Sequence, residues 1–137
     1  MKPVDAHLQD VLSAVAPLGS LNLNLADAHG CVLAEDVFTT FALPPFDSAA
    51  TDGYAVRSDD VRTASPAGPV GLPVVGDIFP GSTAPYTVQP GLCVRITAGA
   101  PMPPGADAVV PRDGTDGGVA NVVIHQAVTP GRFVRAE

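Results

Sequence analysis

Apolar side chains recur with helical spacing in one segment near the start of the chain. The spacing is i, i+3, i+4 and i+7, carried by Leu8, Val11, Leu12 and Val15. Asp5 is a suitable N-cap residue, and Pro17 and Gly19 end the pattern. A helix with one apolar stripe buries that stripe against another surface, so we expect this helix to pack on a neighbour.

The following segments have the patterns of extended chain. Leucine alternates with asparagine in residues 21–25, which is typical of a half-buried strand. A turn of helix fits residues 27–30, and residues 31–39 are interpreted as a second extended piece. After Pro44, five candidate strands are bounded by clusters of Gly, Pro or Asp; they are residues 54–57, 70–75, 92–97, 106–110 and 119–124.

The composition favours short strands over helices. The chain has 14 glycines and 15 prolines among its 137 residues, and these interrupt helices almost throughout. Because 46% of the residues are hydrophobic and 15% are charged, disorder of the whole chain is not expected. We predict a mainly β (α+β) fold, with a short N-terminal helix and an extended β segment followed by an antiparallel barrel-like or sandwich-like domain.

Charge and cysteine usage exclude several classes of function. The net charge is −7, and the basic residues are Lys2 and six scattered arginines. A nucleic-acid or membrane partner is therefore not expected, because both need a basic surface. The N-terminus lacks the apolar core of a signal peptide, and no apolar run reaches the roughly 18 residues of a membrane helix. Cys31 and Cys93 are isolated, which suits a reducing, cytoplasmic location but leaves a bridge between them open.

The stretch "LPPFDSAATDGYAVR", residues 43–57, combines two prolines with two carboxylates. The side chains of Asp47 and Ser48 can bond to the amides that follow them, and Asp52–Gly53 supplies a second turn with Gly53 free to take a positive φ. Two interpretations remain open. The stretch is either a rigid connector whose carboxylates satisfy backbone amides, or a stiff loop that displays Asp52 to a ligand or a magnesium ion.

A second motif, "VRITAGAPMPPGADAVV", spans residues 94–110. A strand leads into the small-residue turn 98–100, where the lack of bulk allows a close approach, and Thr97 can place a hydroxyl at its mouth. The alternative is a tight turn with a proline-rich return.

Two other sets of residues point to no site. Residues 113–118, "DGTDGG", lack the ligands of a calcium loop and are interpreted as a solvated hairpin turn. His7, His29 and His125 are far apart and show no metal-ligand spacing.

Taken in order, these motifs resemble a known family. Together with "HGCVLAEDV" before them and "GDIFPGS" between them, they are similar to the N-terminal part of the molybdopterin molybdotransferases, the MoeA family, which is related to the E domain of gephyrin. The resemblance covers essentially the whole chain.

The resemblance implies a function and a domain organisation. Members insert molybdate into adenylylated molybdopterin in a magnesium-dependent step that releases AMP and the molybdenum cofactor, and they are elongated homodimers. Residues 1–44 would be the first portion of a discontinuous extended β-rich domain, and residues 45–137 an inserted β domain. The segment that completes the extended domain, the pterin-binding α/β domain and a C-terminal β domain are expected downstream.

The resemblance also implies site residues. Asp52 matches the Asp of the family's Asp-Gly-Tyr-Ala motif, which makes it the expected catalytic residue, a possible neighbour of Mg2+, and a group that faces the partner subunit's pterin domain. The expected substrate-binding positions are Asp47, Ser48, Thr51, Gly53, Tyr54, Thr97, Gly99, Ala100 and Pro101.

The chain departs from the family pattern at two positions, Ser48 and Ala98. Ser48 replaces an Asn, and Ala98 stands where the family has a Thr. Thr97 is one place earlier, which would turn its hydroxyl to the other face of a regular strand. A family Gly-Glu-Asp motif would fall beyond Glu137.

The charge suggests a division of labour with the expected pterin domain. An acidic chain is a poor host for molybdate and a pterin phosphate, so we expect the cationic pocket on that domain. This chain would then contribute Asp52 and dimer surface, and it would be inactive alone. The alternative is a non-catalytic β scaffold for self-association or partner docking.

Overall fold

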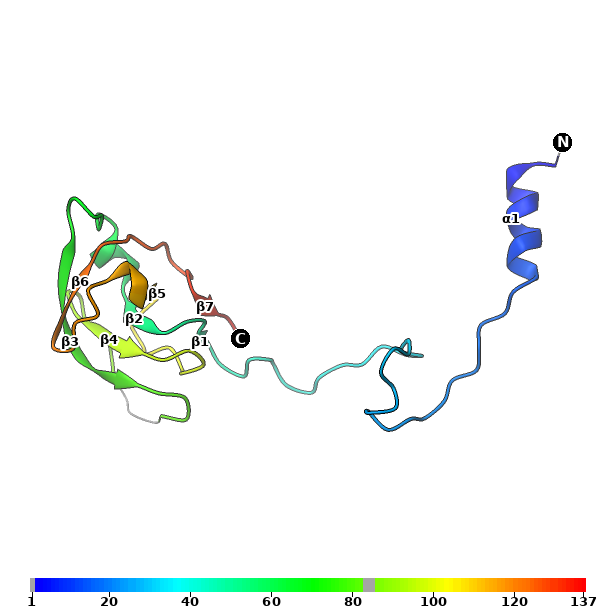
Figure 1. Cartoon of the computed structure of the whole chain (residues 1–137), viewed down its shortest axis with the longest axis horizontal. Helices are drawn as coiled ribbons and strands as arrows, with labels where there is room; N and C mark the ends of the chain where they lie inside the picture. The colour runs from blue at the N-terminus through cyan, green and yellow to red at the C-terminus, as the bar shows by residue number, and fades with distance from the viewer. Residues whose placement is uncertain (1, 83–85) are drawn as a thin grey trace. The chain divides into compact units, whose positions relative to one another are not determined.

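The computed structural model describes residues 2–82 and 86–137. The chain divides into two units, Met1–Phe38 and Thr39–Glu137, called here the N-terminal unit and the β unit (Figure 1). The division proposed from the resemblance, at residues 44 and 45, remains a proposal.

The N-terminal unit contains helix α1, Val4–Ser13. The expected cap was wrong, because Pro3 is the N-cap and no side chain caps the helix. Asp5 instead lies in the first turn, where a carboxylate is favourable beside the helix N-terminus. The helix ends before Pro17, at Ser13, whose hydroxyl donates to the carbonyl of Asp10 at 2.9 Å. No residue of α1 is buried, so the predicted stripe has no packing partner within this unit.

The strand predicted for residues 21–25 does not form. In residues 2–38 the only regular element is α1, and residues 25–30 are turns. The amide of Ala28 donates to the carbonyl of Asn24 at 3.1 Å, and that of Cys31 donates to Ala28 at 3.0 Å. Alternation makes a strand only where a neighbouring strand satisfies its backbone groups, and this unit has none. Leu21 and Leu25 remain exposed.

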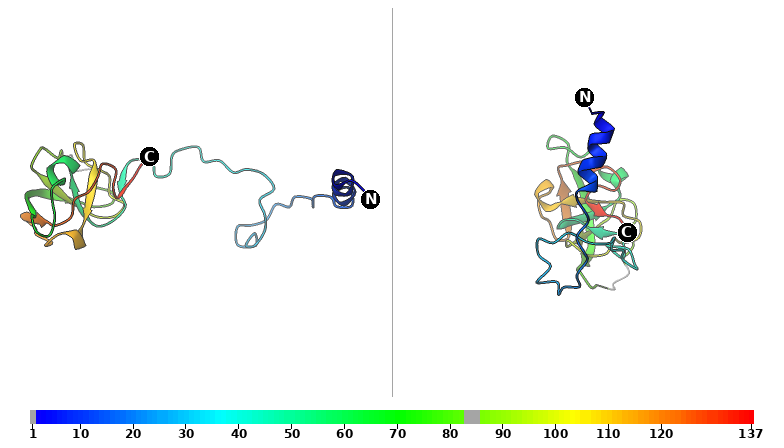
Figure 2. Two further views of the ribbon diagram at one scale, coloured as in Figure 1. Left: turned by 90° about the horizontal axis from the view of Figure 1, so that it is seen from above. Right: turned by 90° about the vertical axis from the view of Figure 1, so that its right-hand side faces the viewer.

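The β unit contains all five predicted strands, with bounds shifted by a few residues. They form one sheet in the order β5-β2-β4-β3-β6, and Figures 1 and 2 show the strands curving around a common interior. Their bounds are Gly53–Val56 for β2, Val70–Ile78 for β3, Cys93–Ile96 for β4, Ala108–Pro111 for β5 and Asn121–Ile124 for β6. The mainly β fold class is confirmed.

The sheet is mixed, and this differs from the expected antiparallel pairing. Strand pairs β2–β4, β2–β5 and β3–β6 are antiparallel, whereas β3 and β4 are parallel. Parallel neighbours need a crossover of a dozen or more residues, and the connection from Ile78 to Cys93 is long enough to provide one.

Two short strands were not predicted. Strand β1, Ser48–Ala49, pairs antiparallel with β7, Val134–Arg135. Two residues carry no periodicity that a sequence pattern could detect. This strand pair joins the stretch 43–57 to the last described segment of the chain.

Strand β2 lies at the centre of the core, and all four of its residues are buried. Neighbouring residues of a strand point to opposite faces, so Tyr54 and Val56 join one apolar cluster while Ala55 joins the other. The first cluster also contains Val110, Val122 and Ile124, and the second contains Ile78, Val94, Ile96 and Val109. Both faces of the sheet are therefore covered around β2.

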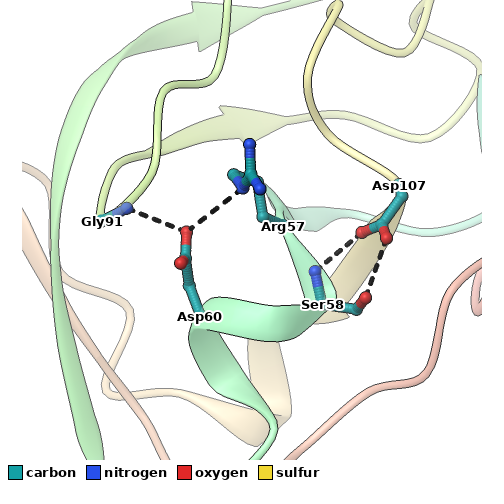
Figure 3. Close-up of polar contacts among 5 residues, drawn as sticks. All are labelled: Arg57, Ser58, Asp60, Gly91 and Asp107. Carbon is teal, nitrogen blue, oxygen red and sulfur yellow. Dashed lines mark hydrogen bonds and ion pairs between the residues drawn. The ribbon is translucent and has the colours of Figure 1, made fainter.

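Polar contacts hold the segment that follows β2, the 3-10 helix η1, Ser58–Val61 (Figure 3). The carboxylate of Asp107 accepts the Ser58 N–H at 2.7 Å and the Ser58 hydroxyl at 2.8 Å. Asp60 accepts the Gly91 N–H at 2.8 Å and lies 3.9 Å from Nε of Arg57. These contacts tie η1 to the residues just before β5 and β4, which fixes β2 between its two neighbours.

Candidate functional site

Residues from both sequence motifs line one shallow pocket of about 200 Å³ on the β unit. Asp52, Gly53 and Tyr54 contribute from the start of β2, and Thr97 contributes from the residue after β4. The structure therefore brings together four of the ten predicted site residues.

Asp52 is exposed at this pocket and is held from two sides. Its Oδ1 accepts the backbone N–H of Ala98 at 2.8 Å, and its carbonyl accepts the N–H of Arg112 at 3.2 Å. Within the described residues no donor contacts Oδ2. Oδ1 thus satisfies a backbone amide, as the rigid-connector interpretation expects, but that amide belongs to another loop. One carboxylate oxygen is anchored and the other remains available.

The structural role of Gly53 differs from the predicted one, which was a turn residue with a positive φ. It does not have a positive φ; it lies within β2, where an added Cβ would be 2.0 Å from the carbonyl oxygen of Val110. Only glycine allows the two backbones to approach this closely. The residue thus sets the spacing between β2 and β5 at the pocket wall.

Tyr54 forms a fixed part of the wall. Its ring is buried, and its hydroxyl donates to the carbonyl of Gly118 at 2.8 Å. Burial raises the pKa of this hydroxyl, against the opposing charges of nearby arginines. Tyr54 therefore stays neutral and acts as a support rather than as a base.

The turn at residues 97–100 shapes the other side of the pocket. The Ala100 N–H donates to the carbonyl of Thr97 at 3.0 Å, and Gly99 has φ +82°, which favours glycine. Strand β4 ends at Ile96, so the argument from a regular strand does not apply to Thr97. Thr97 lines the pocket.

The two motifs also pair through their backbones. The Ala49 N–H donates to Ala100 at 3.0 Å, and the Gly99 N–H donates to Ala49 at 2.8 Å. Ser48 bridges to Pro101, and the Met102 N–H donates to the carbonyl of Asp47 at 2.9 Å. Segments about fifty residues apart in the sequence thus form one support for Asp52.

The other predicted residues lie outside the pocket. Asp47 does not bond to the amides that follow it; its carboxylate accepts the Glu137 N–H at 2.9 Å and lines a separate pocket of about 320 Å³. Ser48 and Ala100 are buried, Thr51 and Pro101 are half-buried, and Gly99 is exposed in its turn. None of these residues lines the Asp52 pocket.

The sequence analysis missed five lining residues, namely Asp77, Phe79, Arg95, Ile96 and Arg112. Arg95 forms an ion pair with Asp77, and the hydrogen bond of that pair raises the pKa of Arg95. Strand alternation could have indicated Arg95, because it is the one half-exposed residue in a strand of buried ones. Two arginines at one pocket also correct the view that the arginines are merely scattered.

The segment 113–118 is the predicted hairpin turn only in part, because Asp113 and Gly114 belong to the 3-10 helix η2, Arg112–Gly114, and Thr115 already bridges to Ile124. The Asp116 N–H donates to Val123 at 3.0 Å, and the His125 N–H donates to Gly114 at 2.9 Å. The Asp116 carboxylate accepts the amides of Val123 at 2.9 Å and Gly118 at 3.0 Å, which lower its pKa. This carboxylate is therefore engaged by the turn.

Other chemistry is sparse in the described part of the chain. No three His, Cys, Asp or Glu residues are grouped as metal ligands there. Cys31 and Cys93 are both free thiols, so the bridge that the sequence left open is not formed. None of the described helices has the length and apolarity that a membrane crossing requires.

Comparisons with known proteins agree with one another. Residues 2–137 match the family described as "MoeA N-terminal region (domain I and II)". The chain is 44% identical over 135 residues to molybdopterin molybdenumtransferase 2 of Mycobacterium tuberculosis, which covers 98% of this chain and 33% of that protein. It is 42% identical over 113 residues to the molybdopterin molybdenumtransferase of Nostoc sp., covering 82% of this chain and 26% of that protein.

A solved structure shows the same fold. The crystal structure of the molybdopterin biosynthesis MoeA protein from Pyrococcus horikoshii superimposes with a TM-score of 0.71 at 34% identity, covering 83% of this chain and 30% of that one. The chain spans about a third of the length of the curated relatives that match it over most of its residues.

Proposed function

The chain belongs to the MoeA N-terminal region family, and on that premise we propose that it presents Asp52 to the substrate of a molybdopterin molybdenumtransferase. The proposed reaction of the whole protein is the insertion of molybdate into adenylylated molybdopterin, with release of AMP. Because the relatives are about three times longer than this chain, the chain alone is proposed to be inactive.

The observation that carries this proposal is the state of the Asp52 carboxylate. Oδ1 is anchored by the Ala98 N–H, and the side chain is exposed at a pocket. A group held in this way needs little reorganisation to meet a ligand, which is the usual benefit of a preorganised site. Asp52 would orient substrate or metal and would not act as a nucleophile.

The pocket fits a shared magnesium ion better than a dedicated metal cage. Mg2+ usually takes one or two carboxylates and completes its shell with waters and substrate phosphates. Asp52 can supply one such oxygen, whereas Asp77 is engaged by Arg95. Asp52 is therefore the proposed protein ligand from this chain, and the metal would supply positive charge for the substrate phosphates.

The size of the pocket supports a composite site. Its volume of about 200 Å³ is below the roughly 300–1,000 Å³ of pockets that enclose drug-sized ligands. An adenylylated pterin therefore needs a second surface, and the proposed one is the pterin domain of the partner subunit in a homodimer. A cytoplasmic location is proposed from the two unbridged thiols.

A chimera tests the function directly. This chain would replace the matching N-terminal third of the Mycobacterium tuberculosis enzyme, and AMP release from adenylylated molybdopterin would be measured with molybdate. We expect an active chimera, and we expect Asp52→Ala to lower kcat by about a hundredfold or more with the dimer intact by gel filtration. The matched control is Asp59→Ala, which removes an exposed carboxylate outside the pocket. Full activity in the Asp52→Ala chimera would refute the proposal.

A second candidate function is a non-catalytic scaffold for self-association. The observation that favours it is the set of exposed apolar residues in the N-terminal unit, of which Leu8 and Leu12 are about half exposed. A chimera that loses its dimer with Leu8→Ser and Leu12→Ser, but keeps its activity with Asp52→Ala, would support this function instead.

A further inference from the structure

We propose that Arg112 is a substrate-binding residue that pairs with a phosphate group of the substrate beside Asp52. The inference rests on the proposed function and assigns a further contact in the same pocket. It departs from the expectation that the cationic pocket lies on another domain.

The first argument is the charge balance of the pocket. Two carboxylates and two guanidinium groups line it. Arg95 and Asp77 form an ion pair and neutralise each other. Arg112 makes no ion pair with any residue in the described ranges, so the pocket keeps one available anion, Asp52, and one available cation, Arg112.

The second argument is that the backbone of Arg112 is fixed beside Asp52. Its N–H donates to the carbonyl of Asp52 at 3.2 Å. Its own carbonyl accepts both the N–H of Thr115 at 3.2 Å and the Thr115 hydroxyl at 2.9 Å. Arg112 opens the 3-10 helix η2, Arg112–Gly114, directly after β5, so its place at the pocket edge is set by the sheet.

The third argument is the position of the side chain. Nε of Arg112 lies 3.6 Å from where a Cβ at Gly117 would stand, which is ordinary van der Waals contact, so the guanidinium group lies beside the Gly117 turn. Burial raises the pKa of the Tyr54 hydroxyl, and the positive charges of Arg95 and Arg112 oppose that shift. The positive charge of Arg112 is therefore close enough to act on Tyr54, which forms part of the pocket wall.

The chemistry of this arrangement suits a phosphate. A guanidinium group presents paired N–H donors that match two phosphate oxygens, and the bonds are strengthened by opposite charge. A phosphate next to Asp52 alone would be repelled. With Arg112 on the phosphate and Asp52 available for a cation, the pocket complements a phosphate that carries a metal ion, as expected for the adenylyl phosphate of the substrate.

A purely structural role for Arg112 makes a different prediction. If the side chain only supports the Gly117 turn, then Arg112→Ala lowers stability and leaves substrate affinity unchanged. Arg112→Lys further distinguishes the structural role from the phosphate-binding role, since lysine keeps the charge but not the paired donors.

The kinetic test uses the active chimera. We expect Arg112→Ala to raise KM for adenylylated molybdopterin by about tenfold or more, with kcat within about twofold, which is the loss expected for a charged hydrogen bond. Arg112→Lys should recover part of the loss. Arg62→Ala is the matched control, because it removes an exposed arginine outside the pocket. An unchanged KM in Arg112→Ala would overturn the inference, whether or not the urea midpoint falls.

A binding test does not depend on activity. The 137-residue chain would be titrated with AMP and Mg2+, and the amide signals of Asp52, Ala98 and Arg112 followed by NMR. We expect saturable shifts that Arg112→Ala abolishes and Arg62→Ala preserves. Shifts that are absent, or equal in Arg112→Ala, would overturn the inference even if the chimera proved inactive. Loss of activity in Asp52→Ala together with normal KM in Arg112→Ala would refute this inference alone and leave the proposed function standing.

Discussion

The carboxylate of Asp52 accepts the backbone N–H of Ala98 at 2.8 Å, although the two residues are 46 positions apart. This bond joins the stretch 43–57 to the small-residue turn 98–100, and these segments belong to the two motifs that carry the family resemblance. It also means that the position and the charge of Asp52 can be separated by mutation, because asparagine keeps an acceptor and removes the charge.

We therefore predict different effects for two substitutions at residue 52. Asp52→Ala should lower the free energy of unfolding of the 137-residue chain by about 1 kcal/mol, since it removes the acceptor for the Ala98 amide. Asp52→Asn should change it by less than about 0.5 kcal/mol, and in the chimera it should still lose activity. Urea denaturation and amide exchange at Ala98 measure the first effect. Equal stability of the Ala variant and wild type would show that the bond does not hold the loop.

The close approach of β2 and β5 gives a second prediction. Gly53→Ala should destabilise the β unit by about 2 kcal/mol or more, because its Cβ would lie 2.0 Å from the carbonyl oxygen of Val110. Gly71→Ala in β3 is the matched control, since nothing lies within 4 Å of its Cβ position. Urea midpoints of both variants provide the comparison, and similar values would contradict the assigned role of Gly53.

Thiol reactivity gives a third prediction. Cys93 is fully buried, and burial raises its pKa to about 12, whereas Cys31 is exposed. Because the thiolate is the reactive form, a disulfide reagent at neutral pH should modify Cys31 quickly and Cys93 only after denaturation. Mass spectrometry of the labelled native chain checks this. Rapid labelling of Cys93 without denaturant would show that the core opens around β4.

Acid pH should weaken the hairpin turn through Asp116. Hydrogen bonds from the amides of Val123 and Gly118 lower the pKa of this carboxyl below its ordinary value of 3.8. Its contribution to stability is therefore complete above that value and is lost as the pH falls through the lower folded-state pKa. Asp116→Asn should flatten the fall in the urea midpoint at acid pH. An NMR titration of the Asp116 carboxyl that gave an ordinary midpoint would contradict this.

The sequence predicted a strand correctly where the residues of that strand carry the signal themselves. Most residues of the five sheet strands are apolar, and turn formers bound the strands, as in β4 and β5. The same reasoning failed at residues 21–25, because alternation says nothing about whether a partner strand exists. It also failed to give the parallel pairing of β3 and β4, which depends on the path of the connection between them.

The candidate site was predictable in part for a related reason. Asp52 and Thr97 stand in motifs whose turn residues are visible in the sequence. Arg112 and Asp77 reach the pocket only because pairings across the sheet place them there, as in the register of Gly53 with Pro111. The positive φ expected at Gly53 was wrong because the constraint comes from a neighbouring strand and not from its own turn.

The strand order also bears on how the chain acquires its structure. Gly53 pairs with both Ile96 and Pro111, so β2 gains its neighbours only after long loops have closed. Loop closure costs entropy before such distant contacts repay it, and β-rich topologies of this kind fold on the order of milliseconds to seconds. During translation, a nascent chain cannot assemble the wall around Asp52 until Arg112 has left the ribosome.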